Sequence, residues 1–76
     1  MTNTELLMQK IKEKGLKIGF IVEKLNTSYG WFNKKLNNEK DFTATEMQVL
    51  CEILGITNLE EKDRIFFAKN VEKSST

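Results

Sequence analysis

The apolar residues of this chain recur at the three- and four-residue spacing of amphipathic helices, in short segments separated by glycine or polar residues. The clearest stripe is Ile18, Ile21, Val22 and Leu25. The chain contains no proline, so no position is barred from a helix on steric grounds. These features predict an all-α, compact five-helix domain. The helices are expected at about residues 4–14, 17–25, 29–37, 44–54 and 59–67, with a polar, frayed tail over 68–76.

One segment allows a second interpretation. Residues 18–22 (IGFIV) have the composition of a strand, and Gly19 costs about 1 kcal/mol in a helix relative to alanine. We interpret the segment as a helix because the apolar stripe continues to Leu25.

Several helix ends carry local signals. Thr43 and Glu46 have the spacing of a capping box, and Phe42 and Met47 occupy the positions of a hydrophobic staple. Ser28 is expected to cap the helix that follows it.

Weaker capping signals occur at the two outer helices. Thr2 with Glu5 is a possible capping box, with Thr4 as the alternative cap, and Asn58 with Glu61 suggests another box. At the other ends, Gly15 and Gly55 fall where a terminating glycine is expected, and Asn26 tolerates a left-handed backbone.

Composition excludes several classes of function. The 76 residues suffice for one small domain, and they include no histidine and a single cysteine, so histidine-based catalysis, histidine metal sites and an internal disulfide are excluded. Cys51 lies on an apolar stripe and is expected to be buried. We expect no enzyme activity, cofactor, metal or small-molecule substrate. The sequence shows no membrane span or signal core, which predicts a cytoplasmic protein.

Two short helices joined by a three-residue turn, Asn26-Thr27-Ser28, are typical of a helix-turn-helix in an all-helical chain of this size. In such a unit the first helix holds the second outward. The exposed face of the second helix can then enter the major groove of DNA.

The residues around this unit also resemble a known family. IVEKLNTSYGWFNKKLNNEKDFTATEMQVLCEILGI is similar to the helix-turn-helix core of the Cro/phage-repressor (XRE-type) DNA-binding proteins, above all to short regulators from phages and prophages of Gram-positive bacteria. The similarity continues to RIFFAKNV near the end of the chain. It implies a lambda-repressor-like fold and a Cro-like repressor that occludes an operator in double-stranded DNA.

The chain departs from the family at several positions. Ile18 stands where the family usually has a polar residue, Asn26 where it has glycine, and Lys35 where a buried aliphatic residue is common. Val22 replaces the usual alanine, and Thr27 replaces an aliphatic residue.

The expected DNA contacts lie on and beside the third helix. Its core side is set by Phe32 and Leu36, and the remaining residues face outward or to the flanks. The candidate DNA-binding residues are Lys17, Ser28, Tyr29, Gly30, Trp31, Asn33, Lys34, Asn37 and Lys40.

These residues differ in expected role. The amide of Asn33 suits a base edge, best adenine, while Lys34 suits a phosphate or a guanine. Tyr29 could offer its hydroxyl to a base or phosphate. Asn37 either contacts the DNA backbone or ends the helix. Gly30 either permits close approach of DNA or is tolerated at this position without a specific role.

A second set of residues is predicted to contact protein. The resemblance implies a weak homodimer through Ile65, Phe66 and Phe67, with burial of the two phenylalanines within the monomer as the alternative. Phe20 lies opposite the core stripe of its helix and either packs on the first helix or joins Trp31 in contacting a partner.

A protein-interaction module is the alternative function. On this hypothesis the same scaffold binds a phage repressor or host protein through Phe20 and Trp31, and the net charge of only +1 and the apolar Ile18 favour it. The charge is uneven, however. Residues 1–40 contain eight lysines and four acidic residues, whereas residues 41–76 contain four basic and seven acidic residues. A DNA backbone would therefore meet the first half.

Overall fold

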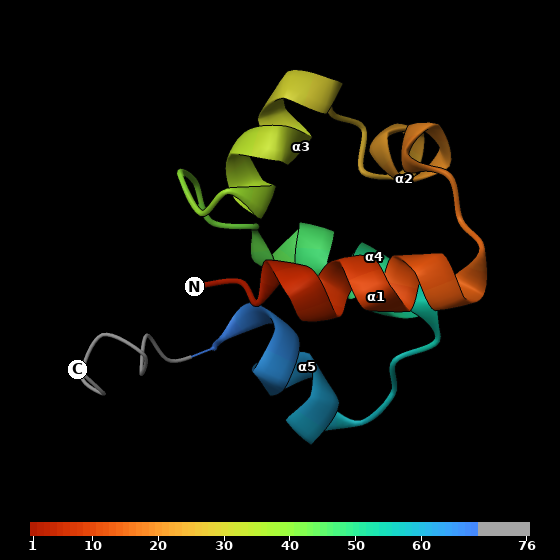
Figure 1. The fold of residues 1–76 in the computed structure, drawn as a ribbon, viewed down its shortest axis with the longest axis vertical. Helices are drawn as coiled ribbons and strands as arrows, with labels where there is room; N and C mark the ends of the chain where they lie inside the picture. Colours follow the sequence, from red (N-terminus) through yellow and green to blue (C-terminus); the bar gives the residue numbers. More distant parts are fainter. Residues whose placement is uncertain (69–76) are drawn as a thin grey trace.

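The computed structural model describes residues 1–68 and confirms an all-helical, compact domain of five helices in this range (Figure 1). Residue 18 begins a helix, so the helical interpretation of 18–22 is correct. Most of the predicted tail, and the last residues of RIFFAKNV, lie outside the described residues. The helices are α1 (Thr4–Lys14), α2 (Ile18–Lys24), α3 (Tyr29–Leu36), α4 (Ala44–Leu54) and α5 (Leu59–Phe66).

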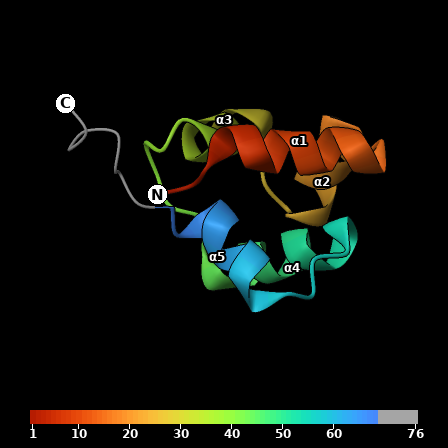
Figure 2. The same cartoon turned by 60° about the horizontal axis from the view of Figure 1, so that its bottom comes forward.

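The five helices form two groups that lie in different halves of the molecule. Helix α1 packs against α4 and α5, while α2 packs against α3. In Figure 1, α2 and α3 lie above α1, and α5 lies below it. Figure 2 shows α1, α2 and α3 in one half of the molecule and α4 and α5 in the other. Helix α3 is therefore held at the periphery rather than enclosed.

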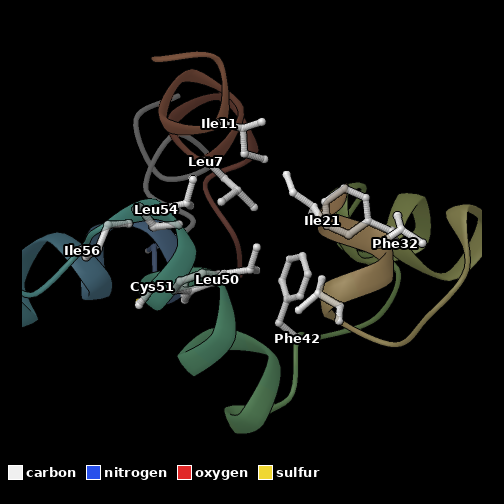
Figure 3. Packing of buried hydrophobic residues seen from close by; sticks show 13 residues of the cluster. Leu7, Ile11, Ile21, Phe32, Phe42, Leu50, Cys51, Leu54 and Ile56 are labelled. Atoms are coloured by element: carbon white, nitrogen blue, oxygen red, sulfur yellow. The ribbon is translucent and has the colours of Figure 1, made fainter. Parts of the chain in front are cut away.

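A single core joins all five helices (Figure 3). An aromatic chain runs through it: Phe32 of α3 meets Phe42 edge-on at 6.0 Å between ring centroids, and Phe42 meets Phe66 of α5 at 5.8 Å. Such edge-to-face pairs stabilise beyond their buried area. The buried residues are Leu7, Ile11, Ile21, Val22, Leu25, Phe32, Phe42, Leu50, Cys51, Leu54, Ile56, Ile65 and Phe66.

The strongest helix-start prediction is confirmed. The Glu46 backbone N–H donates to the Thr43 hydroxyl at 3.1 Å, and the Thr43 N–H donates to the Glu46 carboxylate at 2.9 Å. At the start of α5, Asn58 accepts from the Glu61 N–H at 3.1 Å, which confirms Asn58 as the cap, but the reciprocal bond of the predicted capping box is not formed. The Glu61 carboxylate forms an ion pair with Lys10 of α1.

The predicted cap of α1 is wrong. Asn3 caps this helix, because its side chain accepts from the Leu6 N–H at 3.1 Å. Thr2 is buried and bonded elsewhere through its backbone, and the Thr4 hydroxyl donates to the Leu36 carbonyl at the end of α3. Long-range partners thus take the two threonines that local spacing favoured as caps.

The first four helices share one way of ending. A residue with positive φ follows each of them: Gly15, Asn26, Asn38 and Gly55, with φ between 56° and 71°. At Asn26 the next N–H, that of Thr27, bonds back to the Val22 carbonyl at 3.1 Å. This is a Schellman ending, which needs a residue that tolerates the left-handed region. Asparagine is the usual substitute for glycine there.

Helices α3 and α4 are tied by an ion pair that shares the capping carboxylate. The Lys35 ammonium lies 2.6 and 2.7 Å from the two carboxylate oxygens of Glu46. Burial raises the pKa of Glu46, but the hydrogen bonds from Lys35 and Thr43 and the positive charge of Lys35 together lower it by more, so the net pKa lies below its usual value. The Lys35 ammonium thereby has a charged partner although its side chain is only 12% exposed.

We expect Glu46→Gln to lower the free energy of unfolding at pH 7 by about 1–2 kcal/mol, because Lys35 loses a charged partner while the Thr43 N–H keeps an acceptor. Since the pKa of Glu46 is lowered in the folded state, the stabilisation is complete above its unfolded pKa. It is lost as the pH falls through the folded pKa. Urea titrations from pH 7 to pH 3 should therefore show the free energies of unfolding of the parent protein and of Glu46→Gln converging.

The matched control is Glu52→Gln, which neutralises an exposed carboxylate on the same helix. It should change stability by less than about 0.5 kcal/mol. An equal loss in the two variants would show that the Lys35–Glu46 pair contributes nothing specific.

Candidate nucleic-acid interface

The start of α3 is fixed by the predicted Ser28 cap. Its hydroxyl accepts from the Trp31 N–H at 3.2 Å, and Ser28 itself has an extended backbone. Asn26 reverses the chain just before it, with φ 56°. Local chemistry therefore sets both the end of α2 and the first turn of α3.

The helical wheel of α3 is confirmed in its main feature. Phe32 is 1% exposed and Leu36 packs against the core, so the opposite face is turned outward. Tyr29 is 58% exposed and Trp31 is 48% exposed. The other predicted contacts on this helix and its end are also exposed: Gly30, Asn33, Lys34 and Asn37.

Trp31 lies among cations from two segments. The Lys34 ammonium, one turn along α3, is 5.6 Å from the centre of the Trp31 ring. The Lys40 ammonium, from the loop between α3 and α4, is 5.2 Å from it. Both distances are typical of cation–π contacts. The structure thus brings together three of the predicted DNA-binding residues, including two that are separated by nine positions.

Helix α2 contributes a neighbouring surface. Phe20 is 39% exposed and stays outside the core, with the Lys24 ammonium 5.4 Å from its ring centre, so it does not serve as a core residue. Lys17 is exposed, whereas Ile18 packs against the core. The apolar residue at the start of α2 is therefore explained by packing, and Lys17 is the polar group at this helix end.

Tyr29 connects the two helices. A shallow hollow of about 600 Å³ lies where α2 and α3 begin, and Phe20 and Tyr29 line it. Gly19 faces the Tyr29 side chain so closely that a Cβ atom there would lie 2.9 Å from the Tyr29 hydroxyl oxygen. Gly19 thus leaves the space that this hydroxyl occupies.

The charges separate in space. Residues 17–40 contain five lysines and two glutamates, whereas residues 41–68 contain six carboxylates, one lysine and one arginine. The first range includes α2 and α3, and the second includes α4 and α5, which lie in the other half of the molecule (Figure 2). The exposed face of α3 therefore belongs to the basic part of the protein.

Of the three residues predicted to form a dimer contact, two are buried and one is exposed. Ile65 is 0% exposed and Phe66 is 3% exposed, so both belong to the core and offer no surface to a partner. This corrects the prediction for these two residues, because the α1–α5 contact and the stack on Phe42 enclose them. Phe67 is 55% exposed and borders a hollow next to Leu6. A dimer contact at Phe67 stays a prediction.

Residues 1–68 were also searched for a metal site, a reactive cysteine and a membrane-spanning helix. No group of three or more His, Cys, Asp or Glu side chains in this range is placed to hold a metal ion. Cys51 is buried, and burial raises the pKa of its thiol, which disfavours the reactive thiolate. Among the described helices, none has the length and apolar character needed to cross a bilayer.

Comparisons with protein-family models, with curated proteins and with solved structures gave no match for this chain. What the chain binds is therefore inferred from the face of α3 and its surroundings.

Two residues of this surface, Lys24 and Gly19, were not among the predicted site residues. The spacing of Phe20 and Lys24, four residues apart on one helix, could have indicated their contact. The approach of Tyr29 to Gly19 joins two helices and left no local signal.

We expect Gly19→Ala to displace the Tyr29 hydroxyl at little cost in stability. Tyr29 is exposed and can swing away, while alanine favours the helix by up to about 1 kcal/mol. Urea unfolding should show equal or slightly higher stability, and the tyrosine ring resonances should shift in NMR spectra.

Gly30→Ala is the control, because a Cβ atom there meets only the Ser28 hydroxyl oxygen at 4.0 Å. The tyrosine resonances should then stay in place. A loss of more than about 1 kcal/mol in Gly19→Ala would mean that the Tyr29 position is essential to the fold.

Proposed function

We propose that this protein is a sequence-specific DNA-binding regulator of transcription, in which α2 and α3 act as a helix-turn-helix and α3 is the recognition helix. One observation carries the proposal. Phe32 anchors α3 in the core, so Tyr29, Asn33 and Lys34 face outward from the basic half of the molecule. An exposed, polar and basic helix face at the edge of a small domain suits the major groove of DNA.

The side chains on this face suit different parts of a duplex. The Asn33 amide can donate to and accept from one adenine edge, which discriminates among bases. Lys34, Lys17 and Lys40 are exposed cations suited to phosphates, which position the protein without reading sequence. Bound in this way, the protein would act as a Cro-like phage or prophage repressor that occludes an operator, as a weak homodimer.

Two departures from the family pattern are compatible with this function. Asn26 adopts φ 56°, the conformation for which glycine is usually chosen, so the turn between α2 and α3 is formed without glycine. Lys35 reaches Glu46 and fixes α3 against α4. Both residues hold α3 in place, although neither matches the family residue.

Fluorescence anisotropy with labelled phage intergenic duplexes and with random-sequence duplex tests the proposal. Affinity should fall steeply as salt rises, since each neutralised phosphate releases counterions. At least one intergenic duplex should bind more tightly than the random duplex. Saturable binding that ignores salt, or no binding to any fragment, would sink the proposal.

Two substitutions separate base reading from phosphate contact. Asn33→Ala should relax the preference at one base pair, with a loss of about 1–3 kcal/mol on the preferred duplex only. Lys34→Ala should weaken binding to preferred and random duplexes alike. Equal losses on both duplexes for Asn33→Ala would count against base reading by this residue.

A protein-interaction module is the second candidate. The observation in its favour is the exposure of Phe20 and Trp31, two large aromatic side chains outside the core. On this hypothesis the partner is a phage repressor or host protein. Phe20→Ala would then abolish binding to that partner, and the parent protein would not bind duplex DNA; salt-dependent DNA binding by the parent protein would favour the first proposal.

A further inference from the structure

We propose that Trp31, Lys34 and Lys40 form a binding site for the sugar–phosphate backbone of duplex DNA, in which the ring packs on a deoxyribose and the two ammonium groups hold the adjoining phosphates. This inference rests on the proposed function and specifies a contact that reads no base. It assigns the exposed tryptophan to DNA rather than to a protein partner.

The geometry of the ring is the first argument. Trp31 is 48% exposed although it is the largest side chain in the domain, so a large part of its surface is left open to solvent. It projects from the first turn of α3, on one flank of the outward face. A flat apolar ring at this place can cover the apolar face of a sugar next to the groove that α3 would enter.

The second argument is the convergence of two cations. The ammonium groups of Lys34 and Lys40 lie 5.6 and 5.2 Å from the same ring centre. The ion pairs described within residues 1–68 use other lysines, Lys10 and Lys35. The two ammonium groups carry charges of the same sign beside one ring, so an anion bound close to this ring is attracted by both. A phosphodiester group supplies both this anion and the sugar.

The third argument is that Lys40 is brought there by a fixed loop. Asn38 has φ 62°, and its side-chain amide accepts from the Thr2 N–H at 2.7 Å and donates to the Thr2 carbonyl at 3.0 Å. The loop that follows α3 is thus held by the N-terminal segment (Figure 1). Lys40, two residues later, approaches Trp31 from a pre-ordered backbone, which lowers the entropy cost of binding.

The salt dependence of DNA binding separates the roles of these residues. For the full-length protein and a random-sequence duplex, Lys34→Gln and Lys40→Gln should each reduce the slope of log K against log salt by about 0.9, the value for one phosphate contact. Lys12→Gln, which removes an exposed charge on α1, should leave the slope unchanged. Trp31→Ala should lower affinity roughly tenfold without changing the slope, because the ring carries no charge.

Tryptophan fluorescence gives an independent measurement, because Trp31 is the only tryptophan in the chain. Emission should change on addition of duplex and saturate at the same concentration as the anisotropy signal. Circular dichroism of each variant should match the parent protein, since none of the substituted side chains is buried.

The outcomes are distinguishable. If the protein binds duplex but Lys40→Gln retains the parental slope and Trp31 emission stays constant, this site is overturned while DNA binding stands. A single-stranded oligonucleotide of the same sequence is titrated in parallel. Tighter binding and a larger emission change with this single strand than with the duplex would overturn the duplex assignment. Absence of DNA binding at every salt concentration would overturn both the site and the proposed function.

Discussion

The burial of Phe32 decides what the rest of α3 can do. The ring is 1% exposed and stacks edge-on against Phe42, which in turn stacks on Phe66 of α5. With one side of a two-turn helix fixed in this way, the opposite side must face solvent. The Lys35–Glu46 pair adds a second attachment, from α3 to the first turn of α4. Helix α3 is therefore attached to the core at two points with its opposite side outward, and a site on such a helix is positioned more precisely than one on a loop.

Most of the secondary structure followed from local chemistry. The Thr43–Glu46 box, the Ser28 cap and the left-handed Gly55 involve residues close in the chain, so their spacing alone predicts them. The outward face of α3 was also predictable, because the positions of Phe32 and Leu36 define it. Lys34 and Trp31 were placed on or beside that face by the same periodicity, and the structure finds both exposed.

The remaining features depend on contacts between distant segments. Thr2 has the spacing of a cap, yet the structure bonds its backbone to Asn38, thirty-six residues away. The sequence left open whether Phe66 contacts a partner, as the family resemblance implies, or is buried; its edge-to-face contact with Phe42 places it in the core. The approach of Lys40 to Trp31 depends on the loop that Asn38 and Thr2 fix. No local pattern encodes such pairings.

The most direct test of the central claim, that the outward face of α3 binds DNA, is a titration of isotopically labelled protein with duplex DNA followed by amide NMR shifts. The account predicts that shifts concentrate at residues 28–34 and around Lys40, with smaller changes near Lys17. Helix α5 and the exposed side of α4 should remain unperturbed. Shifts centred on Phe67 and α5, or no shifts at all at concentrations that saturate the DNA, would contradict it.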